Sequence, residues 1–306
     1  MLTIEPGHAT LGARVTGADL NRPLSDADFT NLLKALGEYG VLCFPDQPIE
    51  AAALRAFSSR FGELQVISSA SGRVEPGMPE VSILSNIVEN GRPIGIPDAG
   101  QDWHTDMTYN RVVGFVNVLV AKKVPVRNGK PLGATEFANT QAAYDGLPGE
   151  IKAKLANATA THDWNNFHEL MRRKGSTRPA LTEAQRRERP PVSHPVFLTH
   201  PISGRQVVYV NPGFTVKVNE LDADESRDTL EYLFAHVLKP EYRYVHHWTP
   251  GEVLVWDHIG TWHYAVPDYT PEEHRLMKRC QVLANRIFDP GFVQEGPTLH
   301  GRALAR

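Results

Sequence analysis

Residues 102–106 read Asp-Trp-His-Thr-Asp and place a histidine and an aspartate two positions apart, at His104 and Asp106. Side chains alternate along an extended segment, so these two point to the same side of the chain. An imidazole nitrogen and a carboxylate oxygen that face one way can bind a single metal ion. The chain has 13 histidines, so chance patterns are expected, but only His104 begins a His-x-Asp or His-x-Glu sequence. The competing interpretation of the pair alone is a strand residue hydrogen-bonded to a neighbouring turn.

A second histidine from a distant segment would complete a three-ligand set, and His263 is the candidate. It lies in residues 257–265, Asp-His-Ile-Gly-Thr-Trp-His-Tyr-Ala, directly after a strand predicted at 253–256. Two histidines and one carboxylate on one face of an ion leave its other positions open, which is the ligand set of non-haem Fe(II) oxygenases. His258, in the loop before His263, could hold a metal ligand in position without binding the metal itself. We therefore predict that the His-x-Asp pair and His263 bind Fe(II).

Arg275, twelve residues after His263, suggests an anionic co-substrate. A 2-oxoglutarate molecule chelates iron through its keto oxygen and nearer carboxylate, which leaves the far carboxylate to be bound by the protein. A guanidinium pairs with such a carboxylate through two hydrogen bonds, and a hydroxyl such as that of Thr135 could add another. Arg279 lies four residues after Arg275, which puts both on one side of a helix or a strand. A surface pair within residues 275–279 is the competing interpretation.

The bulk composition describes an ordinary soluble globular protein. Of 306 residues, 41% are hydrophobic and 22% charged, enough apolar mass for a sizeable core. The formal net charge of −3 gives no support for binding to nucleic acid or to a membrane surface. Cys43 and Cys280 lie in apolar runs, so we expect buried free thiols in a reducing compartment rather than a disulfide. The chain opens without a signal segment and has no apolar run near the ~20 residues that span a bilayer, so we expect a cytoplasmic protein.

Many short strand patterns separated by turn signals predict a mainly β fold, a double-sheet jelly roll with flanking helices, in one domain over residues 1–306. Residues 112–120 form a long apolar run that favours a central strand. Residues 242–248 and 252–256 are expected to form a hairpin about the Thr-Pro-Gly turn at 249–251. Helices are predicted from a Ser25 cap to Gly40, over 50–61, near 141–147, after Pro148, and from Asp222 or Asp224 to His236.

Residues 165–191 differ from the rest in composition. They are rich in Arg and Lys, contain few β-branched residues and end in Arg-Pro-Pro at 189–191. One interpretation is a solvated surface insertion. The other is a mobile lid over the metal site, because long insertions in enzymes often have that role.

These motifs together resemble the taurine dioxygenase / 2,4-dichlorophenoxyacetate dioxygenase (TauD/TfdA) family. The resemblance rests on Trp-His-Thr-Asp at 103–106, Gly-Ala-Thr at 133–135, Trp-Asp at 256–257 with 263–269, and Arg-Leu-Met-Lys-Arg at 275–279. Their order and spacing hold from the Gly-Ala-Asp-Leu segment that ends at Leu20 to about residue 288. The resemblance implies a double-stranded β-helix (cupin-like jelly roll), Fe(II), 2-oxoglutarate as co-substrate, and O2.

The family's site residues transfer by position onto this chain. The implied reaction hydroxylates a small organic anion (a carboxylate, sulfonate, sulfate ester or phosphonate), releases succinate and CO2, and can end in C–X cleavage. The resemblance also suggests a homo-oligomer, either a dimer or a tetramer. The implied roles are iron ligation by His104, Asp106 and His263, binding of the distal 2-oxoglutarate carboxylate by Thr135 and Arg275, binding of the substrate's anionic group by Arg279, and an aromatic pocket wall at Phe214.

Two departures from the family pattern bear on the substrate. Residues 65–71 lack the histidine and tyrosine that taurine enzymes carry there, and Gly100 stands where those enzymes have asparagine. Both argue against taurine. Halogenation is disfavoured because Asp106 is present, whereas related halogenases have a small residue at that position. The alternatives to an oxygenase are a cupin-like hydrolase that uses the same ligands on zinc, and a small-molecule binding protein without turnover.

Overall fold

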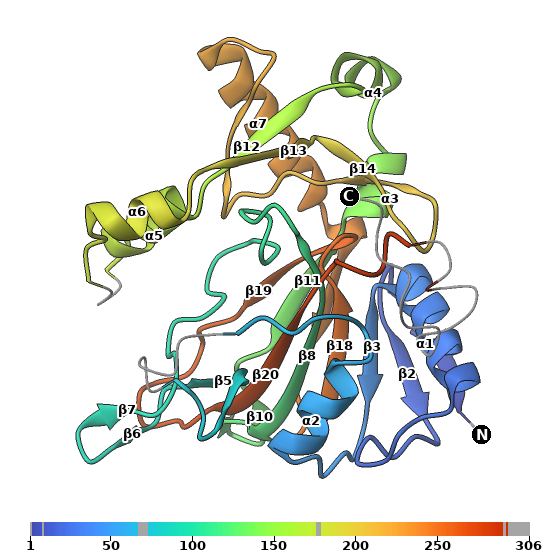
Figure 1. The fold of residues 1–306 in the computed structure, drawn as a ribbon, viewed down its shortest axis with the longest axis vertical. Coiled ribbons are helices and arrows are strands. Elements are labelled where there is room, and N and C mark those ends of the chain that lie inside the picture. Colours follow the sequence, from blue (N-terminus) through green and yellow to red (C-terminus); the bar gives the residue numbers. More distant parts are fainter. Residues whose placement is uncertain (1, 8, 67–72, 176–178, 290–291, 293–306) are drawn as a thin grey trace.

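Pairing between strands far apart in the sequence builds the protein (Figure 1). The computed structural model describes residues 2–7, 9–66, 73–175, 179–289 and Phe292. Over these residues the fold is mixed α/β and rich in strands, with one sheet of eight strands and a facing sheet of three. None of the described helices is long and apolar enough to cross a membrane.

The centre of the larger sheet is the most apolar part of the sequence. β8 (Gly114–Lys123) lies between β18 (Val253–Asp257) and β20 (Leu276–Leu283) and is antiparallel to both. A strand buried on both faces has a continuous apolar sequence. The prediction of a central strand at 112–120 is confirmed, because β8 is paired on both sides. The strand order is β1 (Thr3–Pro6), β2 (Ala13–Thr16), β3 (Val41–Phe44), β18, β8, β20, β5 (Met78–Ser85) and β4 (Val74–Glu75).

Alternate residues of β18 face the two sides of this sheet. Val253 and Val255 pack in the core beneath α1 (Asp26–Tyr39) and α2 (Ala51–Ser58), which Figure 1 shows in blue beside the sheet. α1 begins after the Ser25 cap and ends at Gly40, whose φ of 67° favours glycine. Both predicted ends are confirmed.

The other face of the larger sheet packs against the smaller one. Leu254 and Trp256 of β18 contact a core that includes Phe137 of the second sheet. Each fully buried side chain of this size contributes about 1.5–3 kcal/mol of transfer free energy. The second sheet has the order β17 (Arg243–His246), β11 (Thr135–Asn139) and β19 (Thr261–Ala265), so it carries both Thr135 and His263.

The predicted hairpin between residues 242–248 and 252–256 is wrong. β17 pairs with β11 in the smaller sheet, whereas β18 pairs with β3 and β8 in the larger one. The Thr-Pro-Gly turn at 249–251 therefore carries the chain from one sheet to the other. The same turn residues are compatible with a hairpin and with a change of sheet. The change of sheet is favoured because β18 is buried on both faces and needs a paired strand on each side.

The remaining elements cover the ends of the two sheets. β14 and β15 form a hairpin, and α7 begins after Asp222, one of its two predicted caps. The further strands are β6 (Val88–Glu89), β7 (Arg92–Pro93), β9 (Val126–Arg127), β10 (Lys130–Pro131), β12 (Thr159–His162), β13 (Val192–Pro195), β14 (Phe197–Thr199), β15 (Gln206–Val208) and β16 (Thr215–Val218). The further helices are α3 (Thr140–Asp145), α4 (Gly149–Leu155), α5 (Trp164–Arg173), α6 (Glu183–Glu188), α7 (Ala223–Val237) and the 3-10 helix η2 (Pro240–Tyr242).

Candidate metal centre

His104 and His263 meet through their backbones. The His104 N–H donates to the His263 carbonyl at 3.1 Å, and the His263 N–H donates to the His104 carbonyl at 2.8 Å. This isolated antiparallel bridge attaches the segment before β8 to β19. It brings the two imidazole rings to 4.2 Å between centroids. Two segments far apart in the sequence thus present their histidines side by side.

The Asp106 carboxylate faces both rings. Its Oδ1 lies 3.4 Å from Nε2 of His104, and its Oδ2 lies 3.6 Å from Nε2 of His263. One ligand atom from each residue lies within 4.8 Å of the others, and all three residues are buried. The next residue, Met107, has a φ of 62°, a left-handed conformation that costs a non-glycine residue about 1–2 kcal/mol. The chain therefore turns directly after the last ligand of the pair.

The hydrogen bonds of His104 fit a metal ligand. Its Nδ1 lies 2.7 Å from the carbonyl oxygen of Asp102, which only accepts, so Nδ1 carries the proton. Nε2 is then the ring nitrogen that faces the Asp106 carboxylate. A proton or a metal cation can lie between this nitrogen and the carboxylate oxygen. A metal-binding histidine typically donates its other ring N–H in this way.

The protonation states of Asp106 and His263 also suit metal binding. Burial alone would raise the pKa of Asp106, but the hydrogen bond to His104 and the charge of Arg279 outweigh it and hold this pKa well below its usual value of 3.8. Burial, with the nearby His104, holds the pKa of His263 well below 6.5. The carboxylate is therefore ionised and the imidazole neutral, which are the forms that bind metals.

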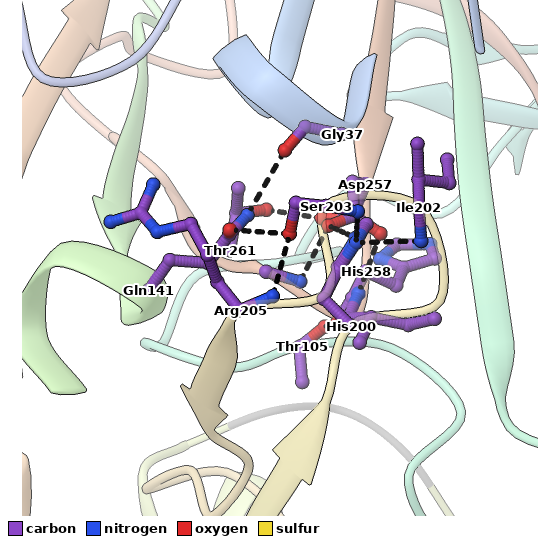
Figure 2. A network of polar contacts seen from close by, with 12 residues as sticks. Gly37, Thr105, Gln141, His200, Ile202, Ser203, Arg205, Asp257, His258 and Thr261 are labelled. Carbon is purple, nitrogen blue, oxygen red and sulfur yellow. Dashed lines mark hydrogen bonds and ion pairs between the residues drawn. The ribbon is translucent and has the colours of Figure 1, made fainter. Parts of the chain in front are cut away.

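A buried network holds the turn that leads into β19 (Figure 2). Asp257 accepts from the backbone N–H of Ile259 at 2.9 Å and of Gly260 at 2.5 Å, and Nε2 of His200 lies 2.9 Å from the same carboxylate. Gly260 has no room for a side chain, because a Cβ there would lie 2.6 Å from Oδ2 of Asp257. The Thr105 hydroxyl, between the two ligands of the His-x-Asp pair, donates to the carbonyl of His258 at 2.6 Å. The two ligand-bearing segments are therefore tied together a second time.

Replacing Thr105 with valine is expected to lower Fe(II) affinity by about 10–100-fold, the usual effect of losing a group that orients a ligand. The buried His258 carbonyl loses its donor, so the free energy of unfolding should also fall by about 1–2 kcal/mol. Anaerobic Fe(II) titration and chemical denaturation measure the two effects. Thr105→Ser keeps the hydroxyl and is the matched control. Equal Fe(II) affinity in both variants would show that this hydrogen bond does not orient the ligands.

His258 lies beside the metal ligands, and its supporting role stays a prediction. Its Nε2 is 3.9 Å from Oδ2 of Asp106, and its side chain is fully buried. Burial lowers its pKa to about 4, so the ring is neutral. Neither ring nitrogen has a hydrogen-bond partner among the described residues.

Both arginines of the 275–279 segment are largely buried, which excludes the surface-pair interpretation. Arg279, on β20, places a guanidinium nitrogen 3.5 Å from Oδ2 of Asp106. Arg275, directly before β20, is 6% exposed, and its Nε has no partner among the described residues. Gly133 adjoins it with a φ of 70°, and a Cβ there would lie 3.0 Å from that Nε. Glycine is required at this position by the backbone conformation and by the arginine.

The two remaining predicted residues are Thr135 and Phe214. Thr135 begins β11, is buried, and its hydroxyl accepts from the indole N–H of Trp248 at 2.9 Å. Phe214 packs edge-on against the His104 ring, with 6.0 Å between centroids. The predicted residues are thus buried or largely buried, with Arg279 beside Asp106 and Phe214 beside His104.

The sequence analysis missed three neighbours of Phe214. Phe167 of α5 lies 4.5 Å from Phe214 and 6.4 Å from His104 between ring centroids, and Tyr109 lies 4.7 Å from Phe214. Met171 joins the same apolar cluster. The available signal was the spacing of Phe167 and Met171, four apart on one face of a helix in an otherwise polar segment.

The fold and the site define a strand-rich protein with a mononuclear metal centre of two histidines and one carboxylate. The model of the family described as "Taurine catabolism dioxygenase TauD, TfdA family" matches residues 3–281. Pentalenolactone F synthase of Streptomyces arenae is 34% identical over 291 residues, covering 93% of this chain and 94% of that protein. The alpha-ketoglutarate-dependent 2,4-dichlorophenoxyacetate dioxygenase of Cupriavidus pinatubonensis is 29% identical over 293 residues, covering 92% and 98%. The structure of AAD-2 with Mn(II) and N-oxalylglycine matches with a TM-score of 0.78 at 26% identity, covering 92% of this chain and 97% of that one.

The chain belongs to the TauD/TfdA family of alpha-ketoglutarate-dependent, non-haem iron dioxygenases. The predicted family, enzyme class and cofactor dependence are confirmed, and His104, Asp106 and His263 form the metal site.

Proposed function

We propose that this enzyme hydroxylates a small organic anion held between Arg279 and the aromatic side chains beside His104. The observation that carries the proposal is a buried guanidinium 3.5 Å from a metal-ligand carboxylate. With iron bound, the family chemistry consumes O2, 2-oxoglutarate and a substrate C–H bond, and yields succinate, CO2 and the alcohol. Where the hydroxylated carbon carries a heteroatom, the product can lose it through C–X cleavage.

Arg275 and Thr135 are the proposed anchors of the distal carboxylate of 2-oxoglutarate. The Arg275 side chain is buried, and its unpartnered Nε suits a ligand that can accept hydrogen bonds from a guanidinium. Trp248 donates to the Thr135 hydroxyl, which leaves the hydroxyl proton free to be donated to a carboxylate.

Arg279 and Phe214 are the proposed substrate contacts. Similar proteins carry names that describe organic anions as substrates, such as 2,4-dichlorophenoxyacetate and sulfate esters. In this chain the aromatic rings of Tyr109, Phe167 and Phe214 suit an apolar body attached to the anionic group. Taurine fits poorly, as Gly100 already suggests. Residues 67–71, which bear on the same point, lie outside the described residues.

Residues 165–191 are the proposed lid, apart from 176–178, which the structure does not describe. α5 buries Phe167, His168 and Met171, whereas α6 has no buried residue. In Figure 1 the two helices project from the body of the molecule. The Phe167 ring of α5 lies 6.4 Å from the His104 ring between centroids. A segment held mainly by one small apolar cluster can open at low cost.

Replacing Phe167 with alanine is expected to uncouple the reaction. Loss of the ring admits water and loosens the substrate, so 2-oxoglutarate is consumed without matching hydroxylation. The ratio of succinate to hydroxylated product is one in a fully coupled reaction, and it should rise to at least about two in this variant. Mass spectrometry of both products measures it, with the exposed α6 substitution Arg187→Ala as control. A ratio that stays at one would remove α5 from the role of lid.

The two facing sheets are proposed to be the two halves of a double-stranded β-helix. The support is the shared core between them, formed by side chains of β3, β8, β18 and β20 on one side and Phe137 on the other. A homo-oligomer, dimer or tetramer, is a separate proposal that light scattering tests.

A substrate panel tests the proposed function. Aryl and alkyl carboxylates, sulfonates, sulfate esters and phosphonates, each with an uncharged analogue, are incubated with Fe(II), 2-oxoglutarate and O2. We expect succinate and hydroxylated product in a one-to-one ratio for at least one anion, and little for its neutral analogue. Arg279→Gln should remove that preference. Product formation without O2 would instead identify a hydrolase, and an equal response to neutral analogues would refute the role of Arg279.

A further inference from the structure

A second group of metal-ligating side chains lies outside the catalytic centre. The thiol of Cys43, the imidazole of His246 and the carboxylate of Glu252 offer one ligand atom each, and these atoms all lie within 4.8 Å of one another. They come from β3, from β17 and from the residue directly before β18. The oxygenase chemistry uses none of the three.

We propose that Cys43, His246 and Glu252 form a second metal site, for a borderline-soft divalent cation such as Zn2+. Sulfur, imidazole and carboxylate are the three ligand types that zinc takes in proteins. Zinc bonds of ~2.0–2.3 Å in a tetrahedral arrangement place ligand atoms about 3.3–3.8 Å apart, so atoms within 4.8 Å of one another need to approach by no more than about 1.5 Å. The catalytic centre has no sulfur ligand, so the two sites differ in the metals they prefer.

The hydrogen bonds around His246 suit such a site. Its Nε2 lies 3.1 Å from Oε2 of Glu252, and its Nδ1 lies 3.1 Å from the hydroxyl of Tyr244. A cation that takes Nε2 moves the ring proton to Nδ1, where the Tyr244 oxygen can accept it. Glu252 is held in place because its Oε2 also accepts from the backbone N–H of Thr249 at 2.8 Å. The ring and the carboxylate are therefore oriented before an ion arrives.

An ion can reach these residues from solvent. Cys43, His246, Glu252 and Tyr244 line a cavity of about 540 Å³, whose other walls come from β1, β2 and the segment between them. Glu5 and Arg14 add one charge of each sign to the same cavity. Burial and, to a smaller extent, Glu252 raise the pKa of the Cys43 thiol to about 12, so binding releases its proton to solvent.

An ion bound by this cluster would connect different parts of the fold. Cys43 belongs to the larger sheet and His246 to the smaller one, so an ion would cross-link the two sheets. Trp248 contacts the His246 ring at 4.9 Å between centroids and donates to the Thr135 hydroxyl. Trp248 would therefore connect the cross-link to Thr135, one of the two proposed anchors of 2-oxoglutarate.

Cobalt titration tests the second site with a signal that the catalytic centre cannot give. Co2+ bound to a thiolate shows an intense near-ultraviolet charge-transfer absorption, and the catalytic ligands include no sulfur. His104→Ala protein, which lacks a complete catalytic centre, should develop this absorption up to one equivalent of Co2+ and lose it on addition of Zn2+. Cys43→Ser should abolish the absorption, and His246→Gln should weaken Co2+ binding at least about tenfold.

Cys280→Ser is the matched control, because Cys280 is the only other cysteine in the chain and lies buried in the core beneath α1 and α2. It should leave the absorption unchanged. The proposal is overturned if wild-type and His104→Ala proteins show no thiolate absorption with stoichiometric Co2+. It is also overturned if the absorption survives Cys43→Ser or disappears in Cys280→Ser.

Discussion

Replacing His104 with alanine is expected to reduce substrate-dependent formation of succinate by more than about 100-fold. Removal of a group that only orients a ligand typically costs 10–100-fold in affinity or activity, so removal of the ligand itself costs more. The remaining pair, Asp106 and His263, cannot fix an ion on one face of the site. The loss should appear in the turnover number and in Fe(II) affinity together. Anaerobic Fe(II) binding and a succinate assay measure the two quantities.

His247→Ala is the matched control for this variant, because His247 is exposed whereas His104 is buried. The control should retain both Fe(II) binding and succinate formation. Circular dichroism and thermal unfolding establish that His104→Ala protein is folded. If folded His104→Ala protein formed succinate at the wild-type rate, the ligand assignment would be refuted.

Replacing Arg275 with glutamine is expected to raise the 2-oxoglutarate concentration needed for half-maximal rate on the order of 100-fold. Loss of one partner of a buried, hydrogen-bonded charge pair costs about 2–5 kcal/mol. Glutamine cannot supply the charge or the paired N–H groups that a guanidinium directs at a carboxylate. Fe(II) binding should change little, because Arg275 is not a metal ligand. Initial rates at varied 2-oxoglutarate concentration measure the effect.

Arg275→Lys separates charge from geometry and should be intermediate, since lysine keeps the charge but not the bidentate fork. Arg22→Gln is the surface control, because the Arg22 side chain is 84% exposed and pairs with Asp19 at the surface. An unchanged 2-oxoglutarate requirement in Arg275→Gln protein would remove this arginine from its proposed role.

The metal centre could be predicted because its chemistry is encoded in residue type and spacing. A His-x-Asp pair on extended chain fixes two ligands locally, and the strand signal before His263 places the third on a sheet. α1 could be predicted for the same reason, since Ser25 and Gly40 mark its ends and its apolar residues repeat at helical spacing. These signals depend on neighbours in the sequence.

What could not be predicted depends on contacts between distant segments. The turn at 249–251 looks like a hairpin, and only the need of β18 for two neighbouring strands reveals the change of sheet. Phe167 lies in a polar segment, and its place beside His104 depends on how α5 packs. Cys43 and His246 belong to different sheets, so no spacing rule connects them. Secondary structure and short ligand motifs can be inferred locally, whereas contacts between elements that share no motif cannot.

The most direct test of the central claim is an anaerobic absorption titration of Fe(II)-loaded protein with 2-oxoglutarate. We expect a weak visible charge-transfer band, because three protein ligands would leave open positions at which the keto oxygen and nearer carboxylate of 2-oxoglutarate could chelate the iron. The band should saturate at one equivalent and be absent from His104→Ala protein. A wild-type protein that binds Fe(II) and shows no such band, or a band that persists without His104, would contradict the assignment of His104, Asp106 and His263 as ligands of one iron.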